Sequence, residues 1–113
     1  MALSSSSAGP EVAPLRVADL EIDALRRRIR QGAREIRLTP AEHTILYTLA
    51  ARAGAWVTYR EIASALGLSD PALAENNTVA RHIYTLRRRL RDDATHPRYI
   101  ETLDGVGYRL LAA

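Results

Sequence analysis

Residues 78–90 read TVARHIYTLRRRL, and residues 96–110 read HPRYIETLDGVGYRL. When the first stretch is placed on a helix at about 100° per residue, its apolar side chains form one narrow stripe, made of Val79, Ile83, Leu86 and Leu90. The opposite side holds polar and basic residues, namely Asn77, Arg81, Tyr84, Thr85, Arg88 and Arg91. The spacing predicts a helix that Asn76 or Asn77 caps and that runs to about Arg91, with one buried face and one basic face.

The second stretch has the pattern of a β-hairpin. Residues 99–103 and 106–110 carry the apolar, aromatic and β-branched residues that strands favour, and they flank the pair Asp104-Gly105. An Asp-Gly pair is the composition preferred by two-residue hairpin turns. The sequence therefore predicts that the chain closes with a β-hairpin whose turn is Asp104-Gly105.

Two capping boxes lie upstream of these stretches. Thr39 and Thr58 can each cap a helix, and a glutamate three residues later, Glu42 or Glu61, can return a hydrogen bond to the cap. Pro40 suits a first helical position because its missing N–H has no partner there. Apolar residues at three- and four-residue spacing follow both boxes, and glycines stand where left-handed C-terminal caps are expected, at Gly54 and Gly67. The sequence predicts helices over residues 40–53 and 59–66.

The N-terminal part of the chain divides in two. Residues 1–14 read MALSSSSAGPEVAP, a serine- and proline-rich composition that we interpret as a disordered leader or an interdomain linker. Residues 15–38 alternate apolar and polar side chains, with breaks at Asp23-Ala24 and Gln31-Gly32, which predicts a small antiparallel meander. The element order predicts an α+β winged helix-turn-helix over residues 15–113, with an N-terminal antiparallel β-sheet, three helices and a C-terminal β-hairpin wing.

The length and composition exclude several classes of protein. A chain of 113 residues has the size of one domain, and 47% apolar with 26% charged residues is typical of a globular protein. No apolar run approaches the roughly 20 residues that cross a bilayer. Because the N-terminus also lacks the basic start and apolar core of a secretory signal, we expect a cytoplasmic protein without membrane contact.

The sequence also lacks residues that many metal sites and enzyme active sites need. The chain has no cysteine and no lysine, which excludes disulfides, thiolate metal sites and Schiff-base catalysis. His43, His82 and His96 have no ligand spacing, and we expect His43 to be exposed or to act as a cap. No acid, base and nucleophile converge with an orienting third group. We therefore expect neither an enzyme nor a bound cofactor or metal.

The positive charge is concentrated on the last predicted helix and the segment after it. The whole chain has a formal net charge of +3, whereas residues 77–98 alone hold six arginines against two aspartates. A basic helix with an apolar back is typical of a recognition helix in the major groove of duplex DNA. The exposed face predicts four base-facing residues, Arg81, Tyr84, Thr85 and Arg88, with Arg81 near the helix start as the main reader. A merely solvated basic face is the alternative interpretation.

The two stretches together resemble the OmpR/PhoB-type winged-helix DNA-binding effector domains of bacterial two-component response regulators, which act in phosphorelays that regulate transcription. The resemblance rests on the helix pattern HI-x-x-LRR-x-L and the hairpin pattern YI-x-T-x-x-G-x-GYR-L, with LTPAEHTIL at 38–46 and GAWVTYREI at 54–62 upstream. It implies a four-stranded N-terminal sheet, a wing that reaches the adjacent minor groove, and DNA sites arranged as direct repeats. It also implies contacts with the DNA backbone by matched residues, namely Thr78, His82, Arg87, Thr102 and Tyr108.

The resemblance implies two protein partners as well. The loop between the second and third helices, here Leu68 to Glu75, would face RNA polymerase and would present Ser69, Asp70 and Glu75. A receiver domain of the full-length protein would be the second partner, but no lysine exists for its active site and the chain is too short to hold it. The sequence therefore favours an effector domain cut at its linker, with a stand-alone relative as the alternative.

Two positions depart from the family pattern. Asn77 stands where an arginine is common, and it can still bind a phosphate without a charge. Asp104 stands at the wing tip, where many relatives carry an arginine for the minor groove, and its carboxylate would be repelled there. Asp104 thus favours a wing that contacts only the backbone. Both departures also support an alternative function, a winged helix that binds RNA polymerase or another regulator without reading DNA.

Overall fold

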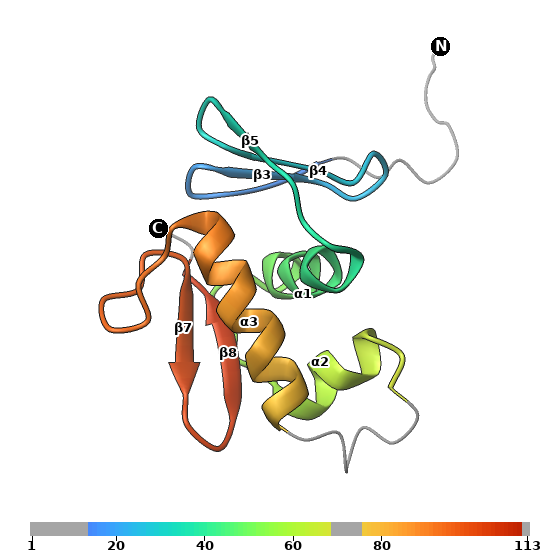
Figure 1. The fold of residues 1–113 in the computed structure, drawn as a ribbon, viewed down its shortest axis with the longest axis vertical. Coiled ribbons are helices and arrows are strands. Elements are labelled where there is room, and N and C mark those ends of the chain that lie inside the picture. The colour runs from blue at the N-terminus through green and yellow to red at the C-terminus, as the bar shows by residue number, and fades with distance from the viewer. Residues whose placement is uncertain (1–13, 69–75, 112–113) are drawn as a thin grey trace.

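The computed structural model describes residues 14–68 and 76–111, with side chains for 14–68 and 78–111. These residues form three helices and two antiparallel sheets (Figure 1). The first sheet is built from β2 (Leu15–Val17), β3 (Leu20–Asp23), β4 (Arg28–Gln31) and β5 (Arg34–Ile36). The helices are α1 (Pro40–Ala51), α2 (Tyr59–Ala65) and α3 (Asn76–Leu90). The second sheet is built from β6 (Val57–Thr58), β7 (Ile100–Leu103) and β8 (Gly107–Leu110). The predicted winged helix-turn-helix is confirmed.

The N-terminal sheet is the predicted meander, with its strands in sequence order. Ile22, Ile29 and Ile36 lie side by side across β3, β4 and β5, and all three are buried against the helices. The outer face carries an alternating row of charges, because Arg16 pairs with Glu21, Glu21 with Arg30 and Arg30 with Glu35. One face of the sheet therefore belongs to the core and the other meets solvent.

Both predicted capping boxes are present. In α1 the Thr39 side chain accepts from the Glu42 N–H at 3.2 Å, and the Thr39 N–H donates to Glu42 at 2.9 Å. In α2 the corresponding pair is Thr58 and Glu61. Gly67 follows α2 with φ +76°, as expected of a left-handed cap, whereas α1 ends at Ala51, earlier than the predicted 53. The local cap chemistry fixes where each helix begins.

Side chains of the N-terminal sheet close the C-terminal end of α3. Gln31 donates to the Leu90 carbonyl oxygen at 2.7 Å, and Arg34 donates to the Arg89 carbonyl oxygen at 2.9 Å. These carbonyls lie in the last turn of the helix, where no further backbone N–H is available to them. Arg34 also donates to Gln31 at 2.6 Å, which joins the two capping side chains. The sheet is therefore bound directly to the helix that carries the basic face.

The wing differs from the sequence prediction in two respects. Its turn has three residues, because the strands end at Leu103 and resume at Gly107, and the Val106 N–H donates to the Leu103 carbonyl oxygen at 3.0 Å. In the four-residue β-turn that this hydrogen bond closes, from Leu103 to Val106, Gly105 is the third residue and takes φ +77°, as a type II turn requires. In addition, β6 pairs with β8, so the wing belongs to a three-stranded sheet. A two-residue strand has no periodicity that a sequence could show.

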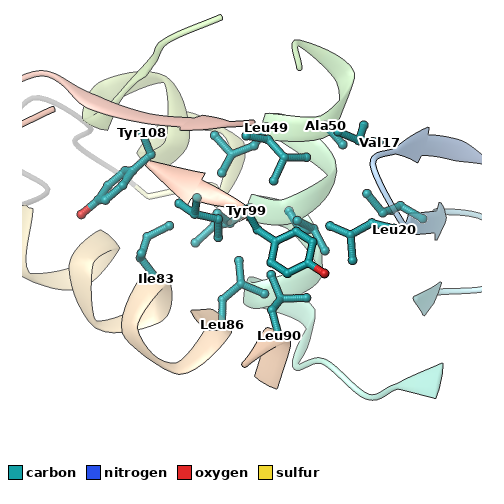
Figure 2. Packing of buried hydrophobic residues seen from close by; sticks show 14 of the residues in the cluster. Val17, Leu20, Leu49, Ala50, Ile83, Leu86, Leu90, Tyr99 and Tyr108 are labelled. Atoms are coloured by element: carbon teal, nitrogen blue, oxygen red, sulfur yellow. The ribbon is translucent and has the colours of Figure 1, made fainter. Parts of the chain in front are cut away.

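The core joins all three helices to both sheets (Figure 2). The predicted stripe of α3 lies at its centre, and each of its residues has at most 1% of its surface exposed. Tyr99 is also buried, and its hydroxyl donates to Asp19 at 2.7 Å, which links the start of the wing to the N-terminal sheet. Among the helices of the described residues, none is long and apolar enough to cross a membrane.

The prediction that His43 is exposed or acts as a cap is wrong, because His43 lies buried on α1. Neither ring nitrogen has a hydrogen-bond partner among the described residues. Burial is the first cause that lowers the pKa of His43, and the neighbouring Arg27 lowers it further, while Asp23 opposes both. The folded protein therefore favours the neutral imidazole.

The burial of His43 predicts a pH dependence of stability. Because the pKa of His43 is lower in the folded than in the unfolded chain, its contribution is fully present above about pH 6.5 and is lost as the pH falls. His43→Phe should remove that loss and should be more stable than the wild type by about 1 kcal/mol at pH 5. Urea unfolding at pH 7.5 and at pH 5 measures the effect. An identical pH slope in both proteins would contradict the prediction.

Candidate nucleic-acid interface

The surface of α3 that faces away from the core is polar and basic. Arg81, Tyr84 and Arg88 are exposed, and Tyr84 has 60% of its surface accessible. Thr78 and His82 lie half-buried at the border of this surface. Because the apolar stripe on the opposite side is fully buried, the basic surface of α3 is fixed in its orientation toward solvent.

Tyr84 and Arg88 lie together one helical turn apart. The Arg88 guanidinium carbon is 5.9 Å from the centre of the Tyr84 ring, and one guanidinium nitrogen is 3.5 Å from the Tyr84 hydroxyl. A shallow hollow beside them is lined by Tyr84, Thr85, Arg88 and Arg89. The Thr85 hydroxyl donates to the His82 carbonyl oxygen at 3.0 Å, so its hydrogen bond is directed into the helix rather than outward.

Arg89 is held by a buried carboxylate on α1. Its Nε donates to Glu42 at 2.6 Å, and the side chain of Glu42 is only 2% exposed. Burial alone would raise the pKa of Glu42, but hydrogen bonds from Thr85, the Thr39 N–H and Arg89 lower it overall. The Thr85 hydroxyl has one proton, which can turn to Glu42 or to its helix carbonyl. The sequence assigned Glu42 to the cap alone, and its spacing gave no signal of the contact with α3.

Arg87 lies at the edge of α3 that faces the wing. One of its terminal nitrogens donates to the Ile100 carbonyl oxygen at 2.8 Å and to the Thr102 hydroxyl at 2.7 Å. The side chain is half-buried, and its Nε is buried without a partner among the described residues. The structure therefore brings two predicted backbone-contact residues, Arg87 and Thr102, together through a contact within the protein.

Tyr108 lies directly opposite Thr102 across β7 and β8, but unlike Thr102 it is buried. It is 4% exposed and packs edge-on against the ring of Tyr59, with 5.4 Å between the ring centres. Burial and the neighbouring Tyr59 raise the pKa of Tyr108 to about 12. The sequence placed Tyr108 in the hairpin correctly, but the alternation of the strand turns it toward the core.

The wing tip is exposed and is not basic. Thr102, Asp104 and Gly105 are exposed, and two apolar side chains, Leu103 and Val106, have 42% and 40% of their surface accessible. On β8, Arg109 donates from its Nε to Glu101 at 2.6 Å. Its guanidinium carbon lies 4.5 Å from the centre of the Trp56 ring. The arginine of strand β8 is thus already paired with a carboxylate of β7.

Several predicted site residues lie outside what the structure describes. The polymerase-facing residues Ser69, Asp70 and Glu75 fall in the undescribed segment 69–75, and the proposed leader falls almost entirely within 1–13. The side chain of Asn77 is not described either, although its backbone belongs to α3. Across the described parts of the chain, no three histidine, aspartate or glutamate side chains gather closely enough to hold a metal ion.

Comparison with known proteins identifies relatives of this arrangement. Residues 32–110 match the family model described as transcriptional regulatory protein, C terminal. Protein PetR of Rhodobacter capsulatus is 34% identical over 108 residues, and the KDP operon transcriptional regulatory protein KdpE of Escherichia coli is 32% identical over 113 residues. These matches cover 92% and 98% of the chain but only 45% and 49% of the relatives, so the chain spans about half of their length.

Solved structures show the same architecture. The DNA-binding domain of RstA from Klebsiella pneumoniae, determined in complex with the RstA box, superposes with a TM-score of 0.82 at 26% identity and covers 88% of this chain and 98% of that domain. The DNA-binding domain of CpxR from E. coli gives a TM-score of 0.76 at 29% identity over the same shares of the two chains. DrrB of Thermotoga maritima, an OmpR/PhoB homologue, gives 0.75 at 32% identity, with 88% of this chain and 44% of that one covered.

Proposed function

The chain belongs to the OmpR/PhoB-type family of transcriptional regulatory protein C-terminal domains, and from this we propose that it binds duplex DNA sequence-specifically, with α3 in the major groove. The observation that carries the proposal is the two-faced character of α3, which buries its apolar stripe completely and presents Arg81, Tyr84 and Arg88 to solvent. The DNA-binding domain of RstA, determined in complex with the RstA box, supports DNA binding by a domain of this fold. No enzymatic step belongs to this function.

The proposal gives the exposed residues two kinds of role. Arg81, Tyr84 and Arg88 face the bases, with Thr85 at their border, because arginine is the commonest reader of guanine in the major groove. The backbone contacts fall to Thr78 and His82, which border this surface, and to Thr102 on the wing. Asn77, in the first turn of α3, is a further backbone contact predicted from the sequence. Asp104 is exposed at the wing tip, so the wing lies along the adjacent backbone instead of entering the minor groove.

The proposal extends to the full-length protein as a response regulator. Relatives about twice as long as this chain support a receiver domain that precedes the winged helix. Two copies would bind direct repeats about one helical turn, or roughly 10 base pairs, apart. RNA polymerase would be the partner of the loop that contains Ser69, Asp70 and Glu75.

Replacing Arg81 with alanine should weaken binding to the preferred duplex by about 2 kcal/mol and relax the preference at one base pair. Selection of bound duplexes from a random pool gives the preferred site, and titration of selected and random duplexes measures the loss. Arg30→Ala is the matched control, because it removes the same charge from the exposed outer face of the N-terminal sheet. Equal losses on selected and random DNA would show that Arg81 only contacts phosphate.

The wing tip supports one alternative function. Leu103 and Val106 are exposed on either side of Asp104, which is an apolar and acidic surface suited to a protein partner rather than to DNA. Under this alternative the domain binds another protein and does not read DNA. Titration with random duplex at low salt separates the two functions, because DNA binding is salt-sensitive even where it is not specific. Absence of any such binding would overturn the proposed function and favour the alternative.

A further inference from the structure

Arg87 joins α3 to the wing through one end of its side chain. The nitrogen that donates to the Ile100 carbonyl oxygen at 2.8 Å also donates to the Thr102 hydroxyl at 2.7 Å, so a single guanidinium bridges a backbone and a side-chain acceptor of β7. Both acceptors lie on the strand that leads to the wing tip. The half-buried guanidinium is thus committed to the protein before DNA arrives.

The geometry of these contacts is typical of an arginine that links two elements of the fold, here α3 and β7, rather than of one that binds phosphate. A planar guanidinium has a fixed set of donors, and two short hydrogen bonds from it define both the distance and the angle between α3 and β7. A phosphate contact, in contrast, requires guanidinium donors that point toward the DNA, and this nitrogen of Arg87 donates both of its hydrogen bonds within the protein. The Nε of Arg87 is buried without a hydrogen-bond partner among the described residues, so protein atoms and not solvent surround this part of the side chain.

Thr102 is affected by the same contact. Because its hydroxyl oxygen accepts from Arg87, the hydroxyl proton is directed away from Arg87. Thr102 is exposed at the wing, so this proton is available to an acceptor outside the protein. Arg87 therefore orients a donor that the proposed function places against the DNA backbone.

We infer that Arg87 is a positioning residue that sets the wing against α3, so that the wing and the helix meet DNA in one geometry. This inference rests on the proposed function and changes the role that the sequence suggested for Arg87, which was a direct contact with phosphate. Arg87 acts through β7 and Thr102, and the wing carries its effect to DNA.

The test compares a variant that keeps the charge with one that removes it. Arg87→Lys retains a cation, but its rotating ammonium lacks the fixed planar directions in which one guanidinium nitrogen donates to both acceptors of β7, whereas Arg87→Ala loses the charge and the contacts. If Arg87 positions the wing, both variants should bind the selected duplex about tenfold more weakly than the wild type. If Arg87 were a phosphate ligand, Arg87→Lys would bind like the wild type, and only Arg87→Ala would lower the salt slope, by about one unit.

Thr102 provides a matched second pair of variants. Thr102→Val keeps the shape, loses the hydroxyl and should bind like Arg87→Lys, whereas Thr102→Ser keeps the hydroxyl and should bind more tightly than Thr102→Val. Arg30→Lys and Arg30→Ala, on the outer face of the N-terminal sheet, control for charge alone. Circular dichroism and urea unfolding establish that each variant is folded before its binding is measured.

Two readouts separate positioning from a loss of fold. Hydroxyl-radical footprinting should show that Arg87→Lys loses protection of the backbone beside the wing and keeps the protection given by α3. Amide hydrogen exchange of the free protein should be faster in residues 100–103 of Arg87→Lys and unchanged in α1. Wild-type affinity, footprint or exchange in Arg87→Lys would overturn the inference. If the wild type binds no duplex DNA, the proposed function fails and this role fails with it; if it binds and Arg87→Lys equals it, only the role fails.

Discussion

Replacing Gly107 with alanine should lower the free energy of unfolding by about 3 to 4 kcal/mol, the largest loss expected of a one-carbon change in this domain. A Cβ at this position would lie 1.9 Å from the Val57 carbonyl oxygen and 2.8 Å from the Thr58 Cα. Both atoms belong to the backbone of β6, which pairs with β8 through Thr58 and Gly107. Since backbone cannot turn aside as a side chain can, β6 would have to separate from β8.

Gly105→Ala is the matched control for this prediction. Gly105 has φ +77°, but a Cβ there would meet nothing within 4 Å, so its substitution should cost only about 1 kcal/mol of backbone strain. Urea unfolding of the two variants measures the difference. If Gly107→Ala were no less stable than Gly105→Ala, the close approach of β6 to β8 would be wrong, and the wing would be a simple two-stranded hairpin.

Replacing Glu42 with alanine should cost the next largest amount, about 3 kcal/mol of unfolding free energy. Glu42 accepts from Arg89 at 2.6 Å and from the Thr39 N–H at 2.9 Å, and its side chain is almost fully buried. Alanine removes half of the capping box of α1 and the ion pair with α3 at once. Arg89 is 44% exposed and can be hydrated after the change, which limits the loss.

The pH dependence of stability at acid pH tests the contact between Glu42 and Arg89. Because the pKa of Glu42 is lowered in the folded chain, its stabilisation is present above the unfolded carboxyl pKa and is lost as the pH falls below about 4. Glu42→Gln keeps a carbonyl oxygen for the cap but has no charge, so the difference between wild type and Glu42→Gln should shrink between about pH 5 and pH 3. A difference that stays constant over that range would exclude a charged contact with Arg89.

The sequence predicted the fold well where the signal is local. Capping boxes fix the starts of α1 and α2 through residues three positions apart, and the stripe of α3 follows from helical spacing alone. The short strand β6 escaped prediction because Val57 and Thr58 are defined as a strand only by a partner about fifty residues later. His43 escaped it because helical position does not show which neighbours cover a side chain.

The candidate site, like the fold, was predictable where its residues depend on helical spacing and not where they depend on tertiary contacts. The angular position of Arg81 and Arg88 on the helix was enough to predict their exposure, since any helix with that apolar stripe presents them outward. Arg87 lies at the boundary of the two faces, where the same angle suits solvent or a neighbouring element. Its contact with β7 depends on how the wing folds back, and that is a property of the tertiary structure. Tyr108 depends on strand alternation in the same way.

The hydrogen bonds from Gln31 and Arg34 to the last carbonyls of α3 also bear on the order in which the chain is made. The residues they join are 59 and 55 positions apart, and the sheet leaves the ribosome first. The side chains that cap the final turn of α3 are therefore already synthesised when that turn is made. An expression fragment that begins after Gln31 would leave the Leu90 carbonyl without its side-chain donor. Fragments prepared for DNA binding should therefore begin before β2 (Leu15–Val17), although the basic face itself lies on α3 (Asn76–Leu90).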